Sequence, residues 1–372
     1  MFNILLIFIF LRPFISSVAY PLENSIYSVL LFLFLVSYLF LKKFELNKLQ
    51  RIKYPLIFFL LSLIISFIFS SSKLNSSLRI FDYILGLLLF FSMFSISAEN
   101  KIRVIQTIIL SGLVVSFLAI YQYFFGFQHL SAYIAKKGID NSFIIDCVNQ
   151  KRVFFPFMTP NILSGFLALS IVFIPVIKHK IKWLFFLTMF IALILTRSLG
   201  GILSIILAII ILNFIQRKLF RRYYYLIVIF ILSLVSIFIL RQFSLKEQFL
   251  PLFSFLSRIE YWKETIDIIK LHPFTGIGLG NLNLSMSRYA HNLYLQLWAE
   301  TGILGLFSFL WLVGAVLKYN IKYIKDFGCN YINLNILLLV AVILFLIDNF
   351  ISFSFFLPEV SFIWWIILGL SI

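Results

Sequence analysis

The chain has 372 residues, of which 62% are hydrophobic and 12% are charged, and its mean hydropathy is +1.06. These values lie far outside the range of soluble globular domains and indicate an integral membrane protein. The formal net charge of +17 would suit a nucleic-acid-binding protein only if the basic residues gathered on one soluble face. They lie instead in short clusters between apolar blocks, which argues against that class.

Apolar blocks long enough to cross a bilayer recur along the whole chain. A hydrocarbon core of about 30 Å needs about 20 residues of helix, and the alternating pattern of membrane strands is absent. We therefore expect an all-α, polytopic protein that forms a single membrane domain over residues 1–372. The expected spans, about twelve, are Phe2–Val18, Ser25–Leu41, Tyr54–Ser70, Leu78–Ser97, Ile102–Phe125, Asn161–Ile177, Trp183–Thr196, Leu199–Ile215, Tyr223–Leu240, Leu293–Leu317, Leu334–Phe350 and Phe355–Leu370.

The basic residues distinguish the two sides of the membrane. If the N-terminus is inside, the short outward connections hold little beyond Lys73, Arg79 and Arg197. Lys and Arg concentrate on the cytoplasmic side of membrane proteins, so both termini are expected in the cytoplasm. The basic clusters of the inner connections begin at Lys42, Lys101, Lys178, Arg217 and Lys318.

Two connections are long, residues 126–160 and 241–292, and both face outward in this topology. Long loops in compact proteins usually carry function. The second lies between the ninth and tenth expected helices and is rich in aromatic residues, glycine and charge. We expect it to fold over the outer membrane face, with Ser257–Leu271 helical. The apolar residues at helical spacing are Ile259, Trp262, Ile266 and Ile269.

The second long connection ends in YAHNLYLQLWAETGILG, where a lone histidine precedes an apolar run. The pattern H-[NSQ]-x9-G-x-x-G is met by His291, Asn292, Gly302 and Gly305. With the upstream turn PFTGIGLGN and an arginine and a tryptophan before it, this segment resembles the signature region of the O-antigen ligase and polymerase superfamily. Residue-level similarity is confined to roughly Arg258–Gly305 and weaker segments, whereas similarity of topology spans most of the chain.

The resemblance implies a GT-C-like helical fold with a large periplasmic loop before the motif. It also implies an enzyme that moves a glycan from undecaprenyl diphosphate to an acceptor hydroxyl. The first acceptor implied is lipid A-core, and the reaction is placed at the outer, periplasmic face of the bacterial inner membrane. Inverting, metal-independent transfer is implied as well, with arginine in place of a metal cation and with no cofactor.

Such a transfer needs a base for the acceptor hydroxyl and cations for the departing diphosphate. Histidine, with an ordinary pKa of about 6.5, can accept a proton near neutral pH. His291 occupies the histidine position of the resembled motif and is the expected catalytic base. An orienting role or a diphosphate contact stays open, and the plain alternative is a histidine that caps the next helix or lies at the membrane interface.

Arginine suits a diphosphate because its planar fork makes bidentate, permanently charged contacts. Arg197 lies on a very short outward connection, where a buried arginine costs about 2.5–3.5 kcal/mol, so its placement needs a compensating role. It resembles the family's arginine at the outer end of a central helix, and Arg258 resembles the loop arginine. Arg152 resembles an arginine that precedes a Pro–Asn pair opening a helix. All three are expected to bind the diphosphate, against a snorkelling or solvated alternative.

The glycine-rich turn contains Gly276, Gly278 and Gly280. A dinucleotide site is excluded because the turn follows a proline rather than a strand. Its glycines permit a tight turn that brings backbone amides near the diphosphate or sugar, or they form a simple loop corner. We expect Gly302 and Gly305 to let helices approach closely. Glu300 is expected to pair with an arginine or to make a plain helix-end contact.

Three functions stay open from the sequence. The first is an O-antigen ligase, and the second is a polymerase of the same superfamily that extends a carrier-bound repeat or another exopolysaccharide. The third is a secondary transporter or flippase for a lipid-linked sugar. Transporters often show paired half-chain repeats and broken helices near the midplane. The ionisable residues here gather at one expected face instead, which favours chemistry at the outer membrane boundary.

Overall fold

The computed structural model describes residues 1–41, 50, 52–94, 96–138, 142–215, 228–239, 251–327 and 334–372. Within these ranges the secondary structure is helical, and no strand occurs. The predicted all-α class is confirmed for this part of the chain. The basic clusters that begin at Lys42 and Arg217, and the first residues of the 241–292 connection, lie outside the described residues.

Four of the described helices are long and apolar enough to cross a membrane, namely Pro21–Leu41, Lys73–Ser92, Ala98–Lys137 and Leu293–Ile324. The shorter apolar helices are Phe2–Phe14, Lys53–Ile68, Pro160–Val176, Lys182–Leu195, Leu199–Ile211, Val228–Ile239, Leu334–Asp348 and Pro358–Leu370. Each of these helices overlaps an apolar block expected from the sequence. They indicate a multi-pass membrane protein, whereas twelve complete spans and the sides faced by their connections stay predictions.

The chain divides into two compact units, each built from segments that are distant in sequence. Unit 1 comprises Met1–Asn24 and Ile102–Leu240, and unit 2 comprises Ser25–Lys101 and Arg241–Ile372. Each unit contains a set of apolar helices and some of the predicted site residues, so each is described by itself.

Unit 1 is organised around helix α9. Its labelled α-helices are α1 (Phe2–Leu11), α6 (Ala98–Tyr121), α7 (Phe127–Lys137), α8 (Ser142–Asn149), α9 (Pro160–Val172), α10 (Lys182–Leu195) and α11 (Leu199–Ile215). Helix α9 packs against α10 and α11 and is buried from Ile162 to Val172, as expected for a helix that is apolar all round. The predicted outer connection 126–160 contains two helices, α7 and α8. Helix α6 continues through the π-helical turn Gln122–Gly126 into α7.

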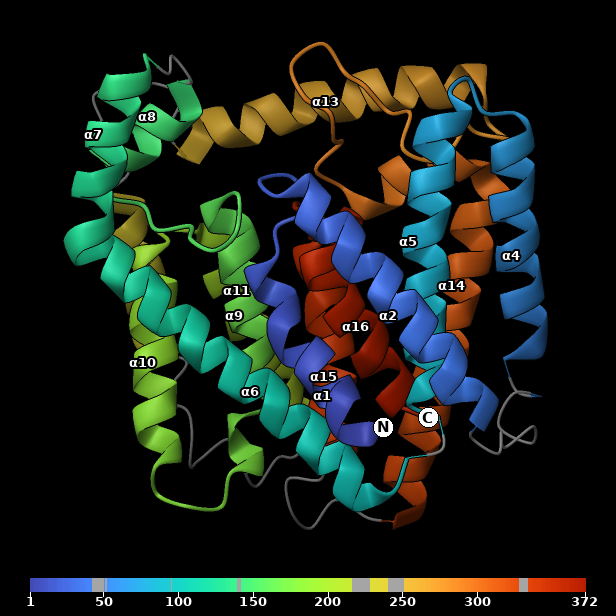
Figure 1. Cartoon of the computed structure of the whole chain (residues 1–372), viewed down its shortest axis with the longest axis horizontal. Coiled ribbons are helices and arrows are strands. Elements are labelled where there is room, and N and C mark those ends of the chain that lie inside the picture. The colour runs from blue at the N-terminus through green and yellow to red at the C-terminus, as the bar shows by residue number, and fades with distance from the viewer. Residues whose placement is uncertain are drawn as a thin grey trace. The chain divides into compact units, whose positions relative to one another are not determined.

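Unit 2 is built on two helix pairs, α4 with α14 and α5 with α16 (Figure 1). Its labelled α-helices are α2 (Pro21–Leu41), α4 (Lys53–Ile68), α5 (Lys73–Ser92), α13 (Pro251–Leu271), α14 (Leu293–Phe327), α15 (Leu334–Asp348) and α16 (Pro358–Leu370). Small residues lie at both contacts. A Cβ on Gly305 of α14 would lie 3.4 Å from Ser62 Oγ of α4, and one on Gly86 of α5 would overlap the Trp365 ring. The main overlap of a Cβ at Gly305 would be with the Thr301 side chain of the same helix, so its expected role in close helix approach stays a prediction.

Helix α13 contains the predicted helix Ser257–Leu271, and it runs crosswise to α4, α5 and α14 (Figure 1). Its apolar spacing did not identify the buried face correctly, because Ile266 is 41% exposed. Thr265 and Ile269 are buried instead, and Arg258 and Trp262 on the same face are partly buried. Ile269 joins an apolar cluster with Leu282, Leu284, Ala290 and Ala299. Helix α13 therefore directs Arg258 toward the interior of unit 2 rather than toward solvent.

Candidate functional site

His291 is the residue just before the cap of α14, and its backbone is left-handed, with φ of 52°. This conformation is uncommon for a residue with a side chain. Asn292 forms the cap, because its Oδ1 accepts hydrogen bonds from the N–H groups of Tyr294 at 2.9 Å and Leu295 at 3.0 Å. The alternative in which His291 caps the helix is therefore wrong. The His–Asn pair combines a strained residue with the residue that begins the helix.

Aromatic rings hold the His291 side chain on two sides. The imidazole stacks on Tyr261 of α13, with ring centroids 5.6 Å apart, and meets Phe353 edge-on at 4.6 Å. Phe353 in turn stacks on Tyr289 at 4.4 Å. No described residue makes a hydrogen bond to the imidazole. Packing thus restrains the ring, and its nitrogens stay available to a ligand.

Arg258 is the charged neighbour of His291. Its Nη1 donates hydrogen bonds to Ser254 O at 3.1 Å and Ser254 Oγ at 3.0 Å, whereas its Nε has no partner among the described residues. Burial, together with the positive charge of Arg258, lowers the pKa of His291 to about 3. The imidazole is therefore neutral at physiological pH and can accept a hydrogen bond. Burial also lowers the pKa of Arg258, partly offset by Asp348 and Tyr261, but a guanidinium stays charged at physiological pH.

A chain of hydrogen bonds connects the backbone next to His291 with the glycine turn. Ala290 N–H donates to Gln296 Oε1 at 3.2 Å, and Gln296 Nε2 donates to Glu300 Oε1 at 2.9 Å. Glu300 Oε2 accepts from Gly280 N–H at 3.0 Å, and the Glu300 side chain is buried. No ion pair within 4 Å is found for Glu300 among the described residues, but Arg79 and Arg288 lie close enough to interact with it electrostatically. Glu300 and Gln296 position the segment that carries His291.

The glycine turn uses its amides within the protein. Gly276 N–H donates to His272 O and Gly278 N–H to Glu300 O, each at 3.1 Å, and Gly280 N–H donates to Glu300 as above. All three glycines have positive φ, and a Cβ on Gly276 would overlap the Glu300 carbonyl. The geometry favours the loop-corner alternative over amides directed at a diphosphate.

Gly302 has a different role from the one expected. It interrupts α14 with φ of 69° and ψ of 179°, and a Cβ there would overlap the Phe274 carbonyl oxygen. Ile303 N–H, just after the kink, donates to Pro273 O at 2.9 Å. Gly302 therefore lets the glycine turn dock on the α14 backbone, and it does not serve a helix–helix contact.

The other two predicted arginines lie in unit 1. Arg197 forms the turn between α10 and α11 with φ of 51°, and no described residue accepts a hydrogen bond from its side chain. Arg152 is 5% exposed, and its Nε donates to Thr196 O at 3.2 Å, beside Arg197 in sequence. Val153 N–H donates to Leu195 O at 3.2 Å, which joins the two segments further. The structure thus groups Arg152 with Arg197 in unit 1 and Arg258 with His291 in unit 2.

Several site residues were not found from the sequence. Tyr261 and Phe353 contact His291 from α13 and from the segment before α16, and Asp348 is an electrostatic neighbour of Arg258. These contacts depend on packing between segments far apart in the chain, which hydropathy does not report. The sequence held one hint of a further polar residue near the outer face. Arg79 is another arginine on a short connection that is expected to face outward.

Residues 184–310 match the family model described as O-Antigen ligase. The matched range includes Arg197, Arg258 and His291, whereas Arg152 and α5 lie outside it. The match covers about a third of the chain, and over this range the resemblance to O-antigen ligases inferred from the sequence is confirmed. The family indicates a membrane glycosyltransferase of the ligase or polymerase type, with a lipid-linked glycan and an acceptor as partners. A comparison with curated proteins finds no match.

Proposed function

We propose that the chain is an O-antigen ligase that moves a glycan from undecaprenyl diphosphate to a hydroxyl of lipid A-core. The reaction takes place at the periplasmic face of the bacterial inner membrane, with both termini of the chain in the cytoplasm. One observation carries the proposal: the neutral, restrained imidazole of His291 lies beside Arg258, and neither its nitrogens nor Arg258 Nε has a hydrogen-bond partner among the described residues. A proton acceptor next to a permanent cation suits a hydroxyl nucleophile and a diphosphate leaving group.

In the proposed reaction, the acceptor hydroxyl hydrogen-bonds to His291 and attacks the anomeric carbon from the face opposite the diphosphate. The new carbon–oxygen bond forms while the bond to the diphosphate breaks, and the diphosphate leaves with the electron pair. The hydroxyl proton passes to His291, and the linkage is inverted. Arg258 binds the departing diphosphate through its guanidinium group. Arg197 and Arg152 are proposed as further diphosphate-binding residues, and the reaction needs no metal.

The low proton affinity of His291 fits this order of events. Burial, and next to it the positive charge of Arg258, disfavours a protonated His291 and lowers its pKa to about 3. A diphosphate bound to Arg258 would add negative charge near the imidazole and raise its pKa again. Donor binding would therefore turn His291 into a better base before the acceptor reacts.

The deciding experiment is an assay of the purified protein in detergent, without added metal, on two acceptors. The donor is undecaprenyl diphosphate-linked glycan, and the acceptors are lipid A-core and a second carrier-linked repeat. A product on lipid A-core supports the ligase, whereas a lengthened carrier-bound glycan would assign the polymerase. A folded preparation that releases no undecaprenyl diphosphate with either acceptor contradicts both and favours the transporter.

The variant His291→Gln distinguishes the two possible roles of His291, as a catalytic base or as an orienting group. Glutamine keeps a hydrogen-bond acceptor near the imidazole position but cannot take a proton at neutral pH. If His291 is the base, His291→Gln loses nearly as much activity as His291→Ala. Retention of a large share of the wild-type rate would assign the orienting role instead.

A further inference from the structure

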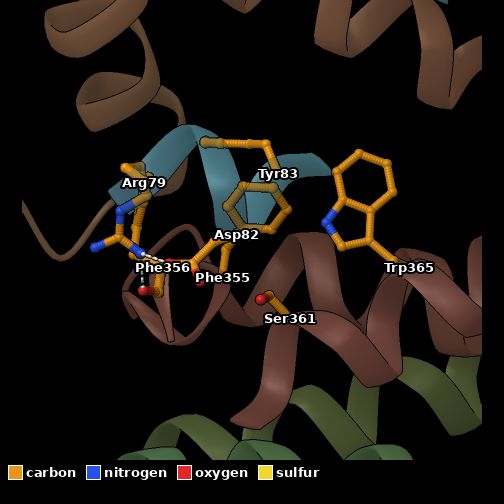
Figure 2. Close-up of a pocket in the computed structure, with 7 residues that line it drawn as sticks. All are labelled: Arg79, Asp82, Tyr83, Phe355, Phe356, Ser361 and Trp365. Carbon is orange, nitrogen blue, oxygen red and sulfur yellow. Dashed lines mark hydrogen bonds and ion pairs between the residues drawn. The ribbon is translucent and has the colours of Figure 1, made fainter. Parts of the chain in front are cut away.

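A small pocket of unit 2 is not used by the proposed mechanism. It lies between α5, the segment that leads into α16 and α16 itself. Seven residues line it (Figure 2), namely Arg79, Asp82, Tyr83, Phe355, Phe356, Ser361 and Trp365. Its cavity volume is about 10 Å³, which is just enough for one water-sized group. The pocket can therefore take a single hydroxyl group, but not a whole sugar ring.

The Tyr83 hydroxyl lacks a partner within the described chain. Tyr83 is 4% exposed, and its Oη makes no hydrogen bond with any described residue. Buried polar atoms in folded proteins are nearly always hydrogen-bonded. A group from outside the chain is the partner that this hydroxyl requires.

Arg79 and Asp82 supply a donor and an acceptor at the same pocket. Arg79 Nη1 donates to the Phe356 carbonyl oxygen and lies 3.5 Å from Asp82 Oδ2. The guanidinium has five N–H groups in all, and no described residue accepts a hydrogen bond from Arg79 Nη2. The side chains of Arg79 and Asp82 are 14% and 24% exposed, so both are reachable from solvent.

The charges and rings of the pocket select the class of ligand. A phosphate or carboxylate would face the Asp82 carboxylate, and a cation would face Arg79. A hydroxyl meets neither conflict, because it can donate to a carboxylate and accept from a guanidinium or a phenol. The apolar walls are the rings of Phe355, Phe356 and Trp365, which are 4%, 2% and 2% exposed, so they border the hydroxyl and offer no open surface to the sugar ring.

Aromatic contacts connect this pocket with the candidate site. Arg79 lies close enough to Tyr289 for an electrostatic interaction, and Tyr289 stacks on Phe353. The edge of the His291 ring meets Phe353. The pocket and the histidine are thus connected within unit 2 through Arg79, Tyr289 and Phe353.

We propose that the Arg79–Asp82–Tyr83 pocket is a glycan subsite, in which one hydroxyl of a substrate sugar binds while the sugar ring stays outside the pocket. This inference rests on the proposed function, since it assumes a glycan substrate. The sugar belongs either to the donor glycan or to the acceptor.

The test uses the full chain in lipid nanodiscs and two probes, undecaprenyl diphosphate-linked O-glycan and free core oligosaccharide from the producing bacterium. The dissociation constant of each probe is measured for wild type, Tyr83→Phe and Asp82→Asn. Tyr83→Phe should weaken one of the two probes about three- to tenfold, and Asp82→Asn about tenfold or more. The probe that weakens identifies the sugar as donor or acceptor.

The thermal unfolding midpoint of Tyr83→Phe should equal or exceed that of wild type, because the removed hydroxyl has no partner in the described chain. Ser28→Ala is the matched control. It removes another buried hydroxyl without a described partner, on α2 and outside the pocket, and should leave both dissociation constants unchanged. If Asp82→Asn does not fold, Tyr83→Phe alone decides.

Unchanged binding of both probes by Tyr83→Phe would overturn the subsite and assign the pocket to a water molecule, whether or not the wild type transfers glycan. Wild-type protein that binds neither probe overturns it as well. If wild type binds a probe but transfers nothing, and Tyr83→Phe weakens that binding, the proposed ligase function fails while the subsite stands.

Discussion

The turns that carry Arg197 and His291 share a backbone conformation but differ in how they hold the side chain. Both residues are left-handed, with φ of 51° and 52°, and both precede an apolar helix. The His291 ring is held by Tyr261 and Phe353, whereas no described residue hydrogen-bonds the Arg197 guanidinium. A group that takes a proton benefits from a fixed orientation before the substrate binds. A cation that holds a charged ligand can become ordered when the ligand arrives.

The strain of the two turns is also offset differently. A non-glycine residue at positive φ costs about 1–3 kcal/mol and persists only where its surroundings hold it. At Arg197 the local hydrogen bond runs from Ser198 N–H to Thr196 Oγ1 at 3.1 Å. At His291 the cap by Asn292 is supplemented by Gln296, Glu300 and the docked glycine turn. These hydrogen bonds that hold the His291 turn come from residues 280–300, whereas the Arg197 turn is also tied to Arg152, 44 positions from Thr196. Substitutions can expose that difference.

The largest effect on activity is expected for His291→Ala. Loss of a general base lowers the rate by about 10²- to 10⁴-fold, and the amount of protein in the membrane should stay normal. Transfer to lipid A-core by the purified variant is the measurement. His272→Ala, an exposed histidine of the same loop, is the matched control and should transfer normally. A His291→Ala variant with near-normal turnover would contradict the proposed mechanism.

Gly302→Ala should lower the stability of the protein at the place where the glycine turn docks on α14, next to the His291 turn. The added Cβ meets the Phe274 carbonyl at positive φ, so we expect a loss of about 3 kcal/mol or more in the free energy of unfolding, with loss of transfer. Gly314→Ala is the control on the same helix, because a Cβ added at Gly314 would have no other atom within 4 Å. That variant should be neutral or more stable by up to about 1 kcal/mol. Equal unfolding midpoints for the two variants would show that the docked turn contributes little.

Arg197→Lys and Arg258→Lys test the diphosphate-binding proposal. A lysine keeps the charge but loses the bidentate fork, so transfer should fall about 10- to 100-fold in each. The measurement is the rate at saturating acceptor as the donor concentration is varied. Arg103→Lys is the control, since Arg103 donates to Asn3 Oδ1 on a segment expected to face the cytoplasm. If Arg197→Lys behaves like Arg103→Lys, Arg197 has only a structural or interfacial role.

Gln296→Leu should lower activity by displacing His291. Ala290 N–H loses its acceptor, and Glu300 loses a donor. We expect kcat to fall about tenfold, with a loss of about 1–3 kcal/mol in stability and an unchanged KM for the acceptor. Ser308→Ala removes a buried hydroxyl bond within α14 and should preserve kcat. An equal loss of kcat in both variants would indicate a general weakening of α14 instead of a positioning role.

The last prediction concerns the pH dependence of stability, not activity. The pKa of His291 is about 3 in the folded chain and about 6.5 when unfolded, so below about pH 6.5 only the unfolded chain takes up this proton. The contribution of His291 to the free energy of unfolding is fully present above about pH 6.5 and is lost as the pH falls toward about 3. The wild-type unfolding midpoint should therefore drop more between pH 7.5 and pH 5 than that of His291→Gln. Parallel midpoints would mean that His291 is solvated and not held neutral by burial and Arg258.

Much of the fold was predictable because its signals are local. Blocks of apolar residues determine the all-α membrane class, and helical spacing placed a helix at Ser257–Leu271. The face of that helix was not predictable, because Ile266 is exposed while Thr265 is buried. Burial depends on what packs against a helix, and spacing alone does not contain that information.

The candidate site divides in the same way. The sequence by itself determined the His–Asn motif, the arginines that suit a diphosphate and the glycine positions where the chain turns. Only the tertiary structure decided that Asn292 caps α14, that Gly302 receives the glycine turn, and that Arg152 bonds to the Arg197 turn. It also brought Arg79 of α5 to Phe356, 277 positions away in the chain. Composition and periodicity report how each segment meets lipid or water, whereas contacts between distant segments arise only when the helices pack.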